Sequence, residues 1–219
     1  MDSRSNAYRK LFRSGLLLLL LFVGYGLFLI NRSGSGGSGE PSAAPLPVLR
    51  TLSSMDLVDQ EGEPVNLQTF RGQPWFANII FTRCPGPCAR MTQKMRQLQE
   101  ALPAEASEVQ LVSLTTDPDF DTPEVLSQYA RKFQADIRSW KFLTGTKEEI
   151  VRVSTQEWLL VMLEKGEAER ESPNDIFLHS TLTVLVDGLG RIRGTYEILE
   201  EGQLEDALAD LQRLLQEAS

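Results

Sequence analysis

Hydrophobic and polar positions follow two different periods along the chain, and these periods predict its elements. Residues 74–81 (PWFANIIF) form a continuous apolar run of strand length, which is typical of a strand buried on both faces. Residues 109–115 alternate as a strand does, whereas the apolar residues after Cys88 recur every three or four positions, as in a helix. The pattern therefore predicts a strand, a helix and a second strand in succession.

The later part of the chain continues this alternation. The pattern predicts helix 122–133, strand 140–143, helix 147–155, strand 158–163, strands 181–186 and 191–198 joined by a turn, and an amphipathic helix over 204–215. A βαβ unit followed by two strands and a helix is the layout of a thioredoxin-like fold of the α/β class. A turn signal at residues 59–62 between two short apolar stretches predicts an N-terminal hairpin extension.

The first 47 residues follow another pattern. Residues 14–30 (SGLLLLLLFVGYGLFLI) carry no charge, and about 17 residues is the short end of what spans a bilayer. We expect one transmembrane anchor there, with residues 1–13 as a basic cytoplasmic tail under the positive-inside rule. A cleaved signal peptide is the alternative, although no small-residue cleavage pattern directly follows residue 30. The Gly, Ser and Pro content of residues 31–47 predicts a flexible linker.

Composition narrows the classes of protein that residues 48–219 can form. The hydrophobic share of 42% argues against global disorder. The formal net charge of -8 argues against a nucleic-acid partner, because binding phosphates needs clustered basic residues. Two cysteines and one histidine exclude a disulfide-rich scaffold and a four-thiolate zinc site. We expect one domain in this part of the chain.

Both cysteines lie where the apolar strand turns into the next helix. Cys84 and Cys88 bracket a Pro-Gly-Pro sequence, and the carboxyl end of a strand in an α/β sheet is where ligands bind. A helix amino terminus favours the thiolate, so we expect lowered thiol pKa values. The pair suits a redox dithiol or a soft site for Cu(I). Two buried structural thiols, or an inert disulfide, are the third interpretation.

The CPGPC sequence resembles the CxxxC motif of the Sco/SenC copper proteins, which are assembly factors for the dinuclear copper centre of cytochrome c oxidase. The resemblance extends to residues 116–126 (TDPDFDTPEVL), which are similar to the DP-x-x-DTP stretch of that family, and to Leu-Thr-Gly at 143–145. His179 falls where the family carries its third metal ligand. Two departures are Ala89, where members often have Pro, and Leu178, where members often have Asp.

The resemblance implies a membrane-anchored metallochaperone that binds one copper ion per chain. Cys84 and Cys88 would bind Cu(I), and His179, arriving from the loop before a later strand, would complete the site for Cu(II). The implied recipient is the copper-bearing subunit of cytochrome c oxidase, with another copper chaperone or a thiol reductant as a further partner. We expect a bacterial inner membrane with the domain in the periplasm, the alternative being the mitochondrial inner membrane facing the intermembrane space.

An enzyme remains the alternative class. Cys84 and Cys88 would then be the catalytic pair of a thiol–disulfide oxidoreductase acting on cysteines of an extracytoplasmic partner. Two features near the cysteines do not decide between a copper chaperone and an enzyme. Arg83 either stabilises a thiolate or is simply exposed, and Asp121 or Thr122 is expected to cap the helix that follows.

Overall fold

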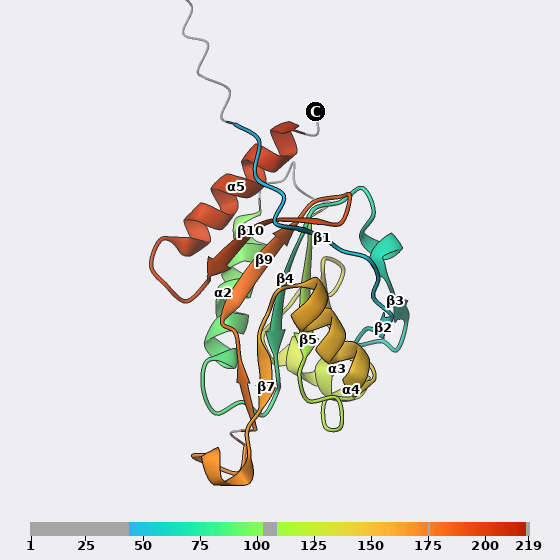
Figure 1. Cartoon of the computed structure of the whole chain (residues 1–219), viewed down its shortest axis with the longest axis vertical. Coiled ribbons are helices and arrows are strands. Elements are labelled where there is room, and N and C mark those ends of the chain that lie inside the picture. The colour runs from blue at the N-terminus through green and yellow to red at the C-terminus, as the bar shows by residue number, and fades with distance from the viewer. Residues whose placement is uncertain (1–43, 103–108, 175, 218–219) are drawn as a thin grey trace, which may run out of the picture. The chain divides into compact units, whose positions relative to one another are not determined.

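The computed structural model describes residues 44–102, 109–174 and 176–217. A six-stranded mixed sheet with the strand order β1-β10-β9-β4-β5-β6 forms its centre (Figure 1). Its strands are β1 (Arg50–Thr51), β4 (Trp75–Ile80), β5 (Gln110–Thr115), β6 (Trp140–Leu143), β9 (Leu182–Val186) and β10 (Arg191–Glu197). Strands β4, β5 and β6 are parallel, and β9 pairs with β4 in the antiparallel direction. This is the predicted thioredoxin-like α/β arrangement.

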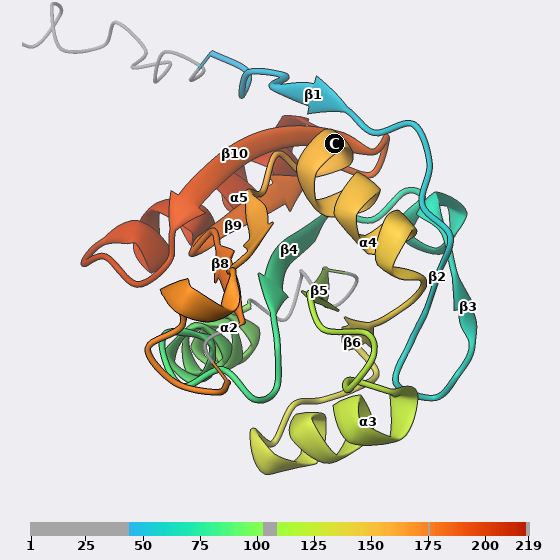
Figure 2. The same cartoon turned by 60° about the horizontal axis from the view of Figure 1, so that its bottom comes forward.

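Helices cover both faces of the sheet. They are α2 (Cys88–Ala101), α3 (Pro123–Lys132), α4 (Lys147–Arg152) and α5 (Gln203–Glu217). Helices α2 and α3 each connect neighbouring parallel strands, and right-handed crossovers are the rule for such connections, which places both helices on one face. The hydroxyls of Thr92 in α2 and Tyr129 in α3 are hydrogen-bonded at 2.9 Å. Helix α5 contacts α2 and β10, whereas α4 lies across the opposite face (Figure 2). The sheet is therefore enclosed between two helical layers.

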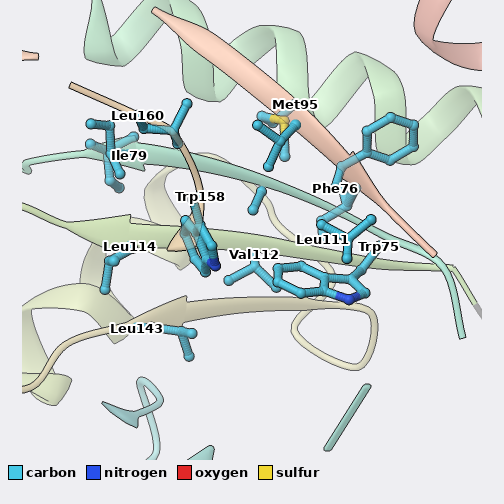
Figure 3. Packing of buried hydrophobic residues seen from close by; sticks show 14 of the residues in the cluster. Trp75, Phe76, Ile79, Met95, Leu111, Val112, Leu114, Leu143, Trp158 and Leu160 are labelled. Carbon is cyan, nitrogen blue, oxygen red and sulfur yellow. The ribbon is translucent and has the colours of Figure 1, made fainter. Parts of the chain in front are cut away.

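The core is centred on β4, whose six residues are all buried. Trp75 stacks on Phe70 of the short helix η1 (Leu67–Phe70), and it meets Trp158 edge to face at 5.7 Å between ring centroids. Figure 3 shows Trp75 and Trp158 among aliphatic side chains of β5 and β6, with Met95 of α2 on the other side of β4. Burial on both faces explains why the strand reads as one apolar run.

Two small hairpins extend from this frame. Strands β2 (Leu57–Val58) and β3 (Pro64–Val65) form the predicted N-terminal hairpin. Strands β7 (Met162–Glu164) and β8 (Phe177–His179) form a second one, which we call the β7–β8 hairpin, with the short helix η4 (Glu167–Glu169) between them. In Figure 1 this hairpin lies at the lower end of the domain, beside the turn from β4 into α2.

The predicted strand over residues 158–163 is wrong in its first half. A π-helical turn, Val153–Glu157, continues α4 and delivers Trp158 into the core as a fully buried side chain. Leu159 then takes a positive φ of 62°, which redirects the chain before β7 begins at Met162. Trp158 and Leu160 are buried, but their local conformation is a helix end and a turn rather than a strand.

The domain begins within the segment that the composition assigns to the linker. Leu46 is 5% exposed, its N–H donates to Glu217 Oε1 at 2.7 Å, and its carbonyl accepts from Arg193 Nη2 at 2.6 Å. The anchor expected over residues 14–30 lies outside the described residues. Within the described part of the chain, no helix combines the length and the apolar character needed to cross a bilayer.

Candidate metal centre

The turn from β4 into α2, residues 81–87, carries the first cysteine, and we call it the cysteine loop. The Cys84 N–H closes a turn on the Phe81 carbonyl oxygen at 3.2 Å. Pro87 takes the cap position of α2, where a residue without an N–H loses nothing, and Cys88 is the first residue of the helix. Both cysteines therefore lie at the carboxyl edge of a central strand, as predicted.

The two thiols lie side by side. Cys88 is only 1% exposed, and its Sγ accepts a hydrogen bond from the Phe81 N–H at 3.5 Å. Cys84 is half-buried, and its Sγ accepts from the Gly86 N–H at 3.3 Å. A side-chain hydrogen bond joins Cys84 to Cys88. The geometry is that of a dithiol with one accessible and one protected sulfur.

The expectation of a lowered thiol pKa is wrong for Cys88. Burial raises the pKa of this thiol well above its ordinary value of 9.0, and the hydrogen bond and charge of Cys84 raise it further. The N–H of Phe81 lowers this pKa, but desolvation of the charged form is the larger effect. Cys88 is therefore a neutral thiol in the metal-free protein, and a bound cation has to displace its proton.

A groove of about 390 Å³ opens beside Cys84 between the cysteine loop and the β7–β8 hairpin. Its lining residues are Phe81, Cys84, Pro85, Gly86, Pro87, Lys165, Glu171, Ser172, Phe177 and Leu178. The rings of Phe81 and Phe177 meet edge to face at 5.5 Å between centroids and form an apolar wall. Such a wall keeps water from a sulfur ligand while leaving the groove open to a partner.

His179 does not arrive from a loop, as the sequence suggested, but is the last residue of β8. It pairs in register with Met162 of β7. Phe177 and Leu178, the two residues before it in the same strand, line the groove that also contains Cys84. The structure thus brings the strand that carries His179 to the cysteine loop. Strand β8 was not predicted, although the apolar residues 176–178 were a signal for it in the sequence.

The carboxylate expected as a helix cap has another role. Thr122, not Asp121, caps α3: its Oγ1 accepts from the Val125 N–H at 3.4 Å. Asp121 turns instead toward the cysteine loop, where it accepts from the backbone N–H and the hydroxyl of Thr82. It could be recognised in the sequence only as a cap because its partners lie on other elements.

Arg83, for which the sequence left a thiolate contact or plain exposure open, has two other partners. Its guanidinium binds Asp117, with Nη2 2.6 Å from Oδ2, and lies over the ring of Phe120 at 4.2 Å. These two partners keep the cation on the α3 side of the loop. Arg83 is therefore neither a free surface charge nor a group committed to a thiolate.

A six-stranded thioredoxin-like sheet with a pair of cysteines at the turn from its central strand into a helix defines this chain as a thioredoxin-like dithiol protein. The family model described as SCO1/SenC matches residues 46–216, which is nearly the whole described domain. The chain belongs to the SCO1/SenC family.

Three known proteins illustrate this relationship. A putative copper-binding protein of Stutzerimonas stutzeri is 37% identical over 110 residues, which are 50% of this chain and 52% of that one. The structure of a SCO1/SenC family lipoprotein from Bacillus anthracis has a TM-score of 0.70 at 30% identity, covering 78% of this chain and 99% of that one. The structure of BsSco, a Sco-family cytochrome c oxidase assembly protein with a disulfide switch, has a TM-score of 0.66 at 27% identity, covering 78% and 97%.

Proposed function

We propose that this chain is a membrane-anchored copper chaperone that binds one copper ion through Cys84, Cys88 and His179. The observation that carries the proposal is a pair of thiols at the turn from β4 into α2, of which Cys84 lines a groove whose other wall is the strand that carries His179. Thiolates select Cu(I), and an added imidazole suits Cu(II). The related Stutzerimonas protein is described as copper-binding, which supports the choice of metal.

The position of the third ligand supports the same site. Phe177 and Leu178 of β8 line the groove with Cys84, and position 179 directly follows them in the same short strand. The Phe177 ring also meets Phe81 of the cysteine loop at 5.5 Å between ring centroids. A nitrogen ligand at position 179 would therefore be near enough to complete a site with the two sulfurs.

Delivery follows from the unequal exposure of the two sulfurs. A partner thiol that loses its proton can attack a copper ion from the open side of the groove. The new sulfur–copper bond forms as the bond to Cys84 breaks, and Cys84 takes up a proton, so the oxidation state of copper does not change. The recipient we propose is the copper-bearing subunit of cytochrome c oxidase, because BsSco belongs to a family of assembly proteins for that enzyme.

We place the domain outside a bacterial inner membrane, held by residues 14–30 and tethered by the linker. The four basic residues before the uncharged run support that orientation. The described lipoprotein relative supports attachment to a membrane in general.

Thiol–disulfide exchange is the second candidate function, and the same asymmetry favours it. The accessible Cys84 would attack a partner disulfide, and the protected Cys88 would resolve the mixed disulfide. The partner gains two electrons and this chain is left with a Cys84–Cys88 disulfide, which a thiol reductant must reopen. The disulfide switch described for BsSco supports a redox-active pair.

A copper titration separates the two functions. The reduced full-length chain is loaded with Cu(I) or Cu(II), challenged with a chelator, and assayed for bound metal and for reduction of a disulfide substrate. We expect one copper per chain, and we expect His179→Ala to lose Cu(II) much more than Cu(I) with unchanged reductase activity. An unmodified chain that retains no copper but reduces disulfides would refute the chaperone.

A further inference from the structure

Each of the two residues that lead into Cys84 is held by a carboxylate from the segment after β5. Thr82 donates its N–H to Asp121 Oδ2 at 3.0 Å and its hydroxyl to Asp121 Oδ1. Arg83 donates from Nε and Nη2 to Asp117 Oδ2 at 3.2 and 2.6 Å. The segment from Asp117 to Asp121 therefore fixes two consecutive residues of the cysteine loop.

Asp121 is the more constrained of the two carboxylates. It is fully buried, and besides Thr82 it accepts a hydrogen bond from the Thr115 hydroxyl at 2.5 Å. Burial raises the pKa of Asp121, whereas the bonds from Thr115 and Thr82 oppose that rise. A carboxylate without water persists only where donors surround it, so these contacts tie the end of β5 firmly to the start of the cysteine loop.

The segment is itself rigid. The Asp121 N–H donates to the Asp117 carbonyl oxygen at 2.8 Å, and the Asp117 N–H donates to Thr115 Oγ1 at 3.0 Å. Thr122 then caps α3 directly after it. The contacts to Thr82 and Arg83 consequently come from a turn that is clamped between a strand and a helix.

The consequence concerns the distance between the two sulfurs. Cys88 is fixed because it is the first residue of α2, whereas Cys84 follows a loop with no secondary structure of its own. Fixing Thr82 and Arg83 leaves Cys84 with little freedom relative to Cys88. A metal site assembled in advance loses less conformational freedom on binding, and partners that orient ligands contribute substantially to affinity.

We propose that Asp121, assisted by Asp117, is a positioning residue for copper binding, which through Thr82 and Arg83 holds Cys84 in place beside Cys88 before the metal arrives. The proposal rests on the proposed function, since it assigns a role toward copper to residues that do not bind the metal. It also gives the DPDFDTP stretch a task that its position as a helix start does not explain.

The test compares Asp121→Ala with Asp187→Ala in the full-length chain. Asp187 is a matched control, because it is also a buried carboxylate with backbone and side-chain donors, but these belong to Leu189, Arg191 and Arg193 at the β9–β10 turn. We expect Asp121→Ala to weaken Cu(I) binding about 10–100-fold, and Asp187→Ala to leave it unchanged. Asp121→Asn, which keeps one oxygen for the Thr82 N–H, should restore most of the affinity.

A second readout needs no copper. The Cys84 N–H bonds to Phe81 and not to Asp121, so its hydrogen exchange reports on the loop rather than on the deleted contact. We expect Asp121→Ala to accelerate exchange at Cys84 in the metal-free protein and Asp187→Ala to leave it as in the unmodified chain. If Asp121→Ala does not fold, Thr82→Val and Arg83→Gln should show the same two changes more weakly.

The failures are distinguishable. If the unmodified chain binds copper and Asp121→Ala binds it equally well, or if Asp187→Ala weakens binding as much, the positioning role is refuted and the chaperone stands. If Asp121→Ala does not fold and Thr82→Val and Arg83→Gln bind as the unmodified chain does, the positioning role is likewise refuted. An unmodified chain that binds no copper refutes the proposed function itself, and the positioning role with it.

Discussion

Cys84 and Cys88 are hydrogen-bonded to each other, yet only Cys84 lines the groove at the edge of the domain. Cys88 is enclosed, with the Phe81 N–H directed at its sulfur. One sulfur is thus accessible to a partner while the other stays attached to the fold. This division suits a protein that passes a metal ion or a disulfide to another protein, since the first bond can break while the second holds.

The first prediction concerns the reactivity of the two thiols. In the reduced, metal-free chain, iodoacetamide should modify Cys84 at least 10-fold faster than Cys88, because alkylation needs an accessible thiolate. Mass spectrometry of the peptide that contains both residues, in Cys84→Ser and Cys88→Ser variants, measures each rate separately. Equal rates in the two variants would contradict the assigned burial of Cys88.

The second prediction concerns the buried carboxylate of Glu157 in the π-helical turn. It accepts from the Ser53 N–H at 2.8 Å and from Arg152 Nη1 at 2.8 Å, and thereby ties the N-terminal segment to the end of α4. Glu157→Ala should lower the free energy of unfolding by about 1–3 kcal/mol, because it leaves these donors without their acceptor. Urea unfolding followed by fluorescence measures the change.

Glu164, an exposed carboxylate, is the control for the Glu157→Ala substitution. It forms an ion pair with Lys147 at 2.7 Å between two half-exposed side chains. Because water already solvates both charges, Glu164→Ala should change the free energy of unfolding by only about 0–1 kcal/mol. A loss at Glu164 as large as that at Glu157 would show that burial does not decide the effect.

The third prediction concerns stability in acid. Burial raises the pKa of Asp187, but hydrogen bonds from the Arg191 backbone and from the Arg191 and Arg193 side chains outweigh burial and hold this pKa below its ordinary value of 3.8. The stabilisation is therefore complete above pH 3.8 and is lost as the pH falls through the lower, folded-state pKa.

Asp187→Asn tests this linkage directly. The free energy of unfolding of the unmodified chain should fall more steeply with decreasing pH below about 4 than that of the variant. Parallel pH profiles for the two proteins would show that Asp187 has the same pKa in the folded and unfolded states.

Much of this fold could be predicted from the sequence because pattern and packing agree. Strand β4 reads as a continuous apolar run and is buried on both faces, and α2 begins at Cys88 where the helical spacing starts. The strand predicted for the segment after α4 was wrong because there pattern and packing do not agree. Trp158 is apolar because it fills the core beside Trp75, and packing of that kind does not specify a strand.

Of the candidate site, only the proposed ligands could be predicted from the sequence. Cysteines and a single histidine are visible in a sequence, whereas Asp121 meets Thr82 only after β4 and β5 pair. Strand β8 escaped prediction because it has three residues and gains its regularity from pairing with β7. Short strands carry too few positions for a period to be read.

X-ray absorption at the copper edge is the most direct measurement of the central claim, that Cys84, Cys88 and His179 meet at one metal ion. Spectra are recorded on the full-length chain loaded with one equivalent of Cu(II), alongside Cys84→Ser and His179→Ala. We expect two sulfur scatterers and one imidazole nitrogen, with one sulfur lost in Cys84→Ser and the imidazole signal lost in His179→Ala. A single sulfur in the unmodified chain, or an imidazole signal that persists in His179→Ala, would contradict it.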